Sequence, residues 1–374
     1  MRGCPIIYFS ILKFMLQKKL QILILAGGGG SRLWPLSRQN SPKQFQNLVQ
    51  KKTLFELAIK RARKIVPWPQ IFVATQKRFL NLAQQQAPKL PTKNFLPEPS
   101  CRDTAAALGL AAQILAQREP QSTIAVFYAD HLIQDEQALK RKVLAAAEVV
   151  EHQDKFAIIE IESQFPATQF GWVKIGRKLT QIQQEPVYAL DQFKEKPALK
   201  QAQIFHRNKN YLWNTGLYVF QPQTLLRALQ KYLPQTSQHL QKLQRNFQNK
   251  KLVAQEYAAC PKISLDFGVM EKLPKKQIVI LPAQLGWSDV GTFASLFAEL
   301  PKDKKNVTNT NLLTAASQGN FVQVVGKQKK LVALLGCQDL VVVDTPDVLL
   351  VCPQNRSAEL KKLTGKLKDS SRFL

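Results

Sequence analysis

Residues 21–38 read QILILAGGGGSRLWPLSR, an apolar strand that runs into four glycines and then into a basic segment. Glycine allows positive φ angles and lets the backbone approach a ligand closely. Successive N–H groups in such a turn form an anion-binding nest, which a following helix N-terminus would strengthen. With Arg32, Arg38 and the nearby Pro42-Lys43-Gln44-Phe45, the stretch predicts a site for a triphosphate.

Two common phosphate-binding motifs do not fit this stretch. GxxxxGK[ST] is absent because Arg32, and not lysine, follows Ser31. GxGxxG fails whether it starts from the first or the second glycine, since Arg32 or Leu33 stands where the last glycine should be. Four glycines alone are also compatible with a flexible turn, and only the neighbouring cations favour phosphate binding.

Apolar runs and helical periods alternate on the C-terminal side of the glycines. Strands are expected at 70–74, 123–128 and 156–161, and helices at 53–65, 104–117 and 137–151. This alternation predicts an α/β fold, a Rossmann-like, mainly parallel or mixed sheet flanked by helices. After Leu190 the alternation loosens, and 211–220 and 277–281 are expected as further strands.

The composition changes near residue 305. Residues 301–310 are polar and are the expected linker, and short β-branched runs follow at 321–325, 331–335, 340–343 and 348–351. The predicted organisation is an N-terminal extension at 1–20, a catalytic domain at 21–300 and a C-terminal β-rich domain at 301–374 that ends in a helix.

The N-terminal extension contains an apolar run that Lys13 interrupts. The run is too short to span a bilayer and no signal-peptide cleavage pattern follows it. We therefore expect no stable membrane insertion, with Met15 as a plausible alternative start and a membrane-surface anchor as the competing interpretation.

The chain has 374 residues and 53 Lys and Arg against 26 Asp and Glu, a formal charge of +27. The basic residues are spread along the chain, which is typical of a solvated surface and not of a nucleic-acid-binding arm. The five cysteines are scattered and form no CxxC pair, so a zinc ribbon is not expected and a reducing cytoplasm is the simplest compartment.

Several further blocks occur in a characteristic order. They are Glu98-Pro-Ser-Cys-Arg-Asp-Thr-Ala105, Ala129-Asp-His-Leu-Ile133, Phe193-Lys-Glu-Lys-Pro197, Trp213-Asn-Thr-Gly216, Val269-Met-Glu-Lys272 and Gly286-Trp-Ser-Asp-Val-Gly291. With the glycine-rich stretch, the set closely resembles the nucleotidyltransferases that make nucleotide sugars, and in particular the mannose-1-phosphate guanylyltransferases. The resemblance covers roughly residues 21–360, and it implies a left-handed β-helix-like C-terminal domain.

The resemblance implies the reaction and its ligands. Mannose 1-phosphate would attack the α-phosphorus of GTP, with Mg²⁺ held by Asp130 and Asp289. The catalytic residues would be Arg32, Lys43 and Lys196, and the sugar-phosphate site would contain Gly171, Glu195, Lys196 and Asn214. The nucleotide site would comprise Ala26, Gly27, Gly28, Gly29, Gly30, Ser31, Arg32, Glu98, Asp103, Thr104 and Asp130.

One departure bears on specificity. The family usually has Arg-Asn-Thr where this chain has Arg102-Asp103-Thr104, and an ionised Asp can only accept hydrogen bonds. A sister enzyme with another nucleotide or sugar therefore stays open, as does a non-catalytic nucleotide-sugar-binding relative. The expected partners are GTP and mannose 1-phosphate, with a homodimer as a possibility and no nucleic acid.

Overall fold

The computed structural model describes residues 19–28, 30–49, 51–151, 153–246, 248–303, 305–326, 330–367 and 372–373. The chain divides into two compact units. The large unit comprises Met1–Gly27, Ile59–Tyr128 and Ile133–Trp287, and the small unit comprises Gly28–Ala58, Ala129–Leu132 and Ser288–Leu374. Most of the expected N-terminal extension, and Gly29 of the glycine run, lie outside the described residues.

The large unit is built on a nine-stranded sheet of order β3-β2-β1-β4-β9-β6-β10-β8-β7. In chain order the strands are β1 (Leu20–Leu25), β2 (Ile71–Gln76), β3 (Phe95–Glu98), β4 (Thr123–Tyr128), β6 (Phe156–Glu162), β7 (Gly171–Ile182), β8 (Glu185–Lys194), β9 (Tyr211–Phe220) and β10 (Ile278–Ala283). The β3-β2-β1-β4 run is parallel, whereas β9 is antiparallel to both β4 and β6. The predicted mixed α/β sheet is confirmed.

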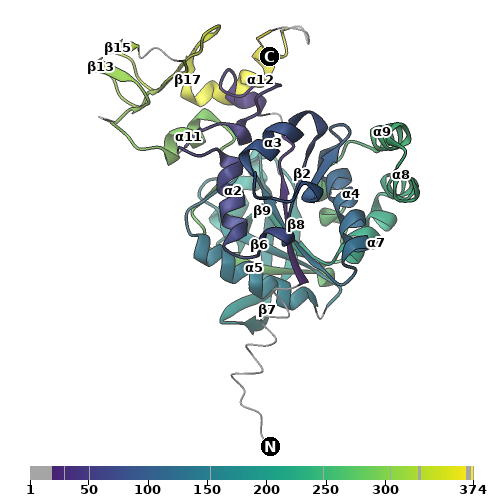
Figure 1. The fold of residues 1–374 in the computed structure, drawn as a ribbon. Helices are drawn as coiled ribbons and strands as arrows, with labels where there is room; N and C mark the ends of the chain where they lie inside the picture. The colour runs from purple at the N-terminus through teal and green to yellow at the C-terminus, as the bar shows by residue number, and fades with distance from the viewer. Residues whose placement is uncertain are drawn as a thin grey trace, which may run out of the picture. The chain divides into compact units, whose positions relative to one another are not determined.

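Helices cover both faces of this sheet (Figure 1). The helices are α2 (Leu54–Arg63), α3 (Leu80–Gln86), α4 (Asp103–Arg118), α5 (Glu136–Glu151), α6 (Leu199–Arg207), α7 (Pro222–Tyr232), α8 (Pro234–Arg245), α9 (Lys250–Ala259) and α10 (Leu265–Gly268). α5 lies on one face, and α4 and α7 lie on the other, where the alanines and leucines of α4 join a large buried cluster with alternate residues of the strands.

The C-terminal part of the small unit is a stack of short strands. β12 (Val307–Thr308), β14 (Phe321–Val324), β16 (Leu340–Asp344) and β17 (Leu349–Pro353) form one sheet, and β13 (Asn311–Ala315) pairs with β15 (Leu331–Leu335). The pairings β12–β14, β14–β16 and β13–β15 are parallel, which is the arrangement of successive β-helix coils. The expected β-helix-like domain is confirmed.

Two elements near the ends of this stack differ from expectation. The predicted linker at 301–310 is partly ordered as β12, because Val307 is buried against the stack and Asn306 is fully buried. The expected C-terminal helix is a 3-10 segment (Gln354–Glu359) followed by the short α12 (Leu360–Thr364).

The remaining elements are α11 (Phe293–Glu299) and the paired short strands β5 (Leu132–Ile133) and β11 (Trp287–Ser288).

Membrane-spanning segments were also sought. Within the described ranges, none of the helices combines the length and the apolar character needed to cross a bilayer.

Candidate active site

The glycine run leads into a 3-10 turn at Ser31–Leu33, where we expected a helix N-terminus. A longer helix does not form because Pro35 follows closely and lacks an N–H group. Gly30 has φ +61° and its carbonyl accepts the Leu33 N–H at 3.0 Å, which closes the turn. The Gln44 side-chain amide donates to the Gly28 carbonyl at 3.1 Å and fixes the other end of the run.

Lys43 joins two predicted metal ligands within the small unit. Its buried ammonium lies 2.9 Å from Asp130 Oδ2, and it donates to the backbone carbonyls of Asp289 and Val290 at 3.1 and 3.2 Å. Arg32, which is exposed, lies close enough for its charge to act on Asp289. The structure therefore brings together Arg32, Lys43, Asp130 and Asp289, which are up to 257 positions apart.

The two carboxylates differ in charge balance. Burial is the largest influence on Asp130 and favours its neutral form, but Lys43, His131 and a backbone hydrogen bond together outweigh it, so the pKa of Asp130 is lowered below its usual value. Burial raises the pKa of Asp289, and the nearby charge of Asp130 adds to the increase although Lys43 opposes it. The two carboxylates thus repel each other, and the Lys43 ammonium, 2.9 Å from Asp130 Oδ2, opposes that repulsion.

This donor set fits a divalent cation. Mg²⁺ is usually held by one or two carboxylates, with phosphate oxygens and water completing its shell. Among the residues the structure describes, no group of three or more His, Cys, Asp or Glu side chains is arranged to hold a metal. Asp130 and Asp289 would therefore supply two ligands, and substrate and solvent would supply the others.

Glu98 lies beside Gly27 in the large unit, where β1 and β3 end. A Cβ at Gly27 would come within 3.4 Å of Glu98 Oε1, so this position approaches the carboxylate closely. Glu98 Oε2 accepts a hydrogen bond from the Tyr257 hydroxyl at 2.7 Å. Burial raises the pKa of Glu98 to about 7, although the Tyr257 hydrogen bond opposes the shift.

Asp103 and Thr104 begin α4. Asp103 has φ +65° and is exposed, and its carboxylate accepts the Thr104 N–H at 2.7 Å. Asn and Asp tolerate this left-handed conformation better than most residues. The Asp that replaces the family's Asn can therefore adopt the same backbone conformation. The Thr104 hydroxyl accepts the Leu265 N–H at 2.8 Å, so it holds the start of α10.

A polar cluster gathers around β7, β8 and β9. Glu195 and Asn214 lie against Gly171, where any Cβ would overlap the Glu195 carboxylate. Lys196 Nζ lies 3.0 Å from Glu195 Oε1, and Lys196 has φ +44°. Asn214 Nδ2 donates to Asp266 Oδ1 at 2.8 Å. The structure thus brings together all four residues expected to bind the sugar phosphate.

Burial also acts on this cluster. It raises the pKa of Glu195 to about 7, and the charge of Asp266 raises it further while Lys196 opposes the shift. A carboxyl group with this pKa changes its protonation near neutral pH, so it can accept from a sugar hydroxyl when ionised or donate to one when neutral.

Sequence reasoning missed several residues of these clusters. Tyr257 holds Glu98, and Asp266 with Tyr218 holds Asn214. None of the three stands in a block that singled it out, and Tyr257 is 159 positions from Glu98. Asp266 lies just before the Val269-Met-Glu-Lys272 block, which was the one available signal.

The predicted nucleotide residues fall in both units, and Arg38 is used differently from the expectation. Ala26, Gly27, Glu98, Asp103 and Thr104 belong to the large unit, and Gly28, Gly30, Ser31, Arg32 and Asp130 belong to the small unit. Arg38, which we expected beside the phosphates, is bound instead to Asp347.

Comparison with known proteins agrees with this geometry. The nucleotidyl transferase family model matches residues 21–306, and a model described as the mannose-phosphate isomerase/GMP-like β-helix domain matches residues 317–367. The mannose-1-phosphate guanylyltransferase of Escherichia coli K12 is 32% identical over 96% of this chain and 75% of its own length.

Two further relatives extend the comparison. The alginate biosynthesis protein AlgA of Pseudomonas fluorescens is 33% identical over 94% of this chain and 72% of its own length. The crystal structure of a Thermus thermophilus protein described as a mannose-1-phosphate geranyltransferase superposes with a TM-score of 0.82 at 29% identity, and covers 93% of this chain and 99% of that chain. The chain belongs to the nucleotidyl transferase family, in the group of the mannose-1-phosphate guanylyltransferases.

Proposed function

We propose that the chain transfers GMP from GTP to α-D-mannose 1-phosphate, giving GDP-mannose and pyrophosphate. The observation that carries the proposal is the Lys43 ammonium between Asp130 and the Asp289 backbone, in the same unit as the glycine-rich turn. This is the charge arrangement that a nucleoside triphosphate needs at its reacting phosphate. The E. coli relative carries the name of this activity.

The chemistry is an in-line displacement. A phosphate oxygen of the sugar phosphate forms a bond to the α-phosphorus, and the bond from that phosphorus to the bridging oxygen breaks, which releases pyrophosphate. The nucleophile is already an anion, so no general base is required. Catalysis then consists of positioning and charge neutralisation.

The residues divide this work. The Gly28 to Ser31 backbone and Arg32 bind the β- and γ-phosphates, and Lys43 neutralises charge at the α-phosphate. Asp130 and Asp289 would hold Mg²⁺, which would neutralise negative charge at the phosphates. Lys196 orients the phosphate group of mannose 1-phosphate, while Glu195 and Asn214 contact the sugar hydroxyls.

Base selection is assigned to Glu98. An ionised Glu98 can accept from the N1–H and N2–H₂ donors of guanine, and adenine lacks this pair of donors. Tyr257 fixes the carboxylate by donating to Oε2, which leaves Oε1 toward Gly27. Because the Glu98 pKa is about 7, we expect the affinity for GTP to fall as the pH drops below neutrality.

We also propose a homodimer and a cytoplasmic location. The exposed face of β13 and β15 presents Leu313, Leu331 and Leu335, with exposed fractions of 61, 65 and 81%, and an apolar face of this kind favours association. None of the four described cysteines forms a disulfide, which supports a reducing compartment. Light scattering of the purified protein tests the dimer, and a monomer at micromolar concentration would contradict it.

Pyrophosphate release from the purified chain with Mg²⁺ and mannose 1-phosphate tests the main proposal. Comparing GTP with ATP, UTP and dTTP separates the alternatives. Release with GTP alone supports the guanylyltransferase. Strong release with another nucleotide indicates a sister specificity on the same machinery. A lack of release with any nucleotide, together with measurable nucleotide-sugar binding, favours a non-catalytic relative.

A further inference from the structure

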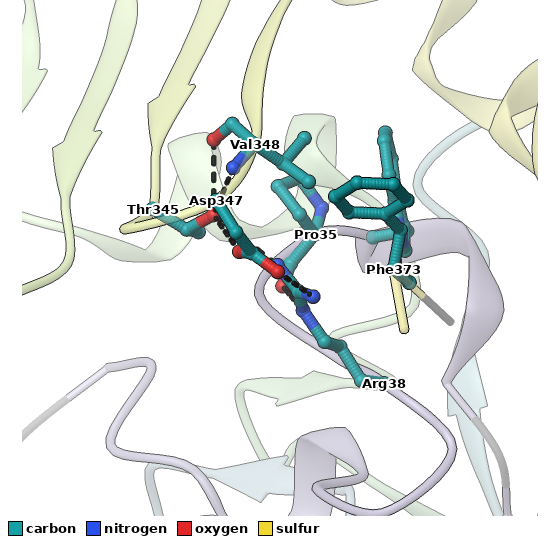
Figure 2. A network of polar contacts seen from close by, with 7 residues as sticks. Pro35, Arg38, Thr345, Asp347, Val348 and Phe373 are labelled. Carbon is teal, nitrogen blue, oxygen red and sulfur yellow. Dashed lines mark hydrogen bonds and ion pairs between the residues drawn. The ribbon is translucent and has the colours of Figure 1, made fainter. Parts of the chain in front are cut away.

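Arg38 ends the glycine-rich stretch, and all three of its side-chain nitrogens are engaged within the small unit (Figure 2). Nη1 and Nη2 donate to the two carboxylate oxygens of Asp347 at 2.8 and 2.6 Å. Nη2 also donates to Thr345 Oγ1 and Nε donates to the Pro35 carbonyl, both at 3.2 Å. A guanidinium bound in this bidentate way presents its fork to a carboxylate, so it is not directed at a phosphate.

Asp347 is held in place for this contact. It lies in the turn between β16 and β17, where the Val348 N–H donates to Thr345 Oγ1 at 3.0 Å and closes the turn. The Arg38 hydrogen bonds are the largest influence on Asp347, and they lower the pKa of its carboxyl group. The carboxylate therefore stays ionised at neutral pH, and the pair persists.

Residues 37–43, which include Arg38, pack closely against the glycine-rich turn. The neighbouring residue, Ser37, packs on Gly30 so closely that a Cβ at Gly30 would overlap its hydroxyl. The same Cβ would lie 3.1 Å from the side chain of Lys43. Arg38 and Ser41 exchange backbone hydrogen bonds of 3.0 and 3.1 Å, so the chain turns back toward Lys43. A shift at Arg38 would therefore be transmitted to both Gly30 and Lys43.

Other contacts join the same segment to the C-terminal residues. The Trp34 indole donates from Nε1 to the Phe373 carbonyl at 2.6 Å. Leu33 and Leu36 share a buried cluster with Val343 and Leu350 of the β-stack and with Leu360 of α12. The Arg38–Asp347 pair is thus one polar part of a larger contact between residues 33–38 and the C-terminal residues.

We propose that Arg38 is a positioning residue that, through Asp347, holds Gly30 and Lys43 in the conformation that binds the nucleotide triphosphate. This proposal rests on the proposed function, because it assigns a role within the same site. The C-terminal β-strands, through Asp347, would thereby help to position the residues that bind the phosphates. This role also separates Arg38 from Arg32, which is exposed and has no described carboxylate partner within ion-pair distance.

A double-mutant cycle with Arg38→Ala, Asp347→Ala and the double variant tests this role. Each single variant should raise the KM for GTP by about tenfold, and the double variant should be no worse than either single one, because both remove the same interaction. The KM for mannose 1-phosphate should change by less than about threefold. Arg38→Lys should recover only part of the GTP effect, since one ammonium cannot bind both carboxylate oxygens in a fork.

The competing role of Arg38 as a phosphate ligand gives a different pattern. Asp347→Ala would then leave the KM for GTP near the wild-type value, and Arg38→Ala alone would raise it. That result would overturn the proposal. Glu359→Ala is the matched control, because it breaks an exposed two-point pair with Arg356 in the same unit, at 2.9 and 3.1 Å. It should leave all kinetic constants unchanged.

Hydrogen exchange separates failure of this proposal from failure of the proposed function. Amides of residues 28–45 should exchange faster in Arg38→Ala and in Asp347→Ala, to the same extent, while Glu359→Ala keeps the wild-type rates. This readout needs no turnover, so it decides the role of Arg38 even if the wild-type chain releases no pyrophosphate. Unchanged exchange of this segment in both variants would also overturn the proposal.

Discussion

At the scale of single residues, backbone strain marks the places where the chain departs from ordinary geometry. Asp103, Lys196 and Val290 all have positive φ angles, of 65°, 44° and 44°. Two of them are predicted ligands, and the third accepts a hydrogen bond from Lys43 through its carbonyl. Such conformations are costly for non-glycine residues and persist where the surrounding structure imposes them. Five further non-glycine residues with positive φ in the described part of the chain lie outside the predicted site, so this geometry describes the site residues but does not by itself identify the site.

Asp289→Asn removes one of the two carboxylates that face Lys43. We expect a loss in kcat of about 10²–10³, by analogy with the removal of one transition-state donor, because charge neutralisation at the phosphates is weakened. Asp191→Asn, which changes an exposed carboxylate paired with Lys174 and Lys275, should retain normal turnover. Turnover by Asp289→Asn near the wild-type rate would remove Asp289 from the metal site.

Glu98→Gln tests the electrostatic environment of the proposed base site. The pKa of Glu98 is raised from 4.5 to about 7, so between these values the folded chain keeps a proton that the unfolded chain releases. The contribution of Glu98 to stability therefore falls as the pH rises through this window. Relative to wild type, Glu98→Gln should be more stable at pH 8 than at pH 5 by on the order of 2 kcal/mol.

Urea denaturation at several pH values measures this difference. Tyr257 can still donate to the amide oxygen of the variant, so the hydrogen bond is retained. Glu162→Gln is the control, since Glu162 is exposed and its variant should follow the wild-type profile. Parallel profiles for wild type and Glu98→Gln would show that Glu98 is ionised in the folded chain throughout the range.

At the scale of elements, the helices and strands that were predicted best are those in which buried apolar residues recur at the helical or strand spacing. β4 and β9 have the expected bounds, α4 is one residue longer than expected at each end, and α5 is one residue longer at its start. The β7–β8 hairpin and α6 to α9 were missed. β7 is buried only at its start, so most of its residues carry no apolar period. α8 buries Thr236 and Ser237 along with two leucines, which hides its helical pattern.

A buried asparagine links successive coils of the β-stack. Asn320 is fully buried, and its side-chain amide donates to Asn306 Oδ1 and to the Cys337 carbonyl, each at 3.0 Å. Its own Oδ1 accepts the Leu340 N–H at 3.0 Å. Asn320→Ala would leave the Leu340 and Cys337 backbone groups without these partners. It should lower the free energy of unfolding by about 3 kcal/mol, since each unpaired buried group costs about 1–3 kcal/mol.

Asn309→Ala is the matched control for Asn320→Ala. Asn309 also makes two hydrogen bonds to one backbone residue, Val324, at 2.9 and 3.0 Å, but it is exposed. Water can replace those bonds, so we expect a loss below about 1 kcal/mol. Equal losses in the two variants, measured by urea denaturation, would show that burial of Asn320 has no energetic role.

At the scale of the whole molecule, the charge of +27 has a consequence of its own. We expect duplex DNA to be retained only at low ionic strength and to dissociate by about 0.2 M salt, because such binding comes from counterion release at phosphates. Two unrelated sequences should bind equally in fluorescence polarisation. Retention of one sequence above that salt concentration would revive the nucleic-acid-binding interpretation.

The candidate site could be predicted from the sequence only as a set of positions. The motif resemblance selected Lys43, Asp130 and Asp289, and the structure brings them together. It gave no means of finding Tyr257 or Asp266, because a supporting hydrogen bond depends on which side chains meet in the fold and leaves no local pattern. The Arg38–Asp347 pair could not be found for the same reason, since the two residues lie 309 positions apart.

The Arg38–Asp347 pair has a consequence for how the residues from Gly27 to Arg38 should vary among related proteins. The run from Gly27 to Arg38 is continuous in the sequence and suggests one ligand-binding stretch, yet the described hydrogen bonds of the Arg38 side chain all go to other residues of the protein. Its two halves should therefore evolve under different pressures. The glycines and Arg32 should vary with the nucleotide, whereas positions 38 and 347 should co-vary, and a relative that lacks one of them should lack the other.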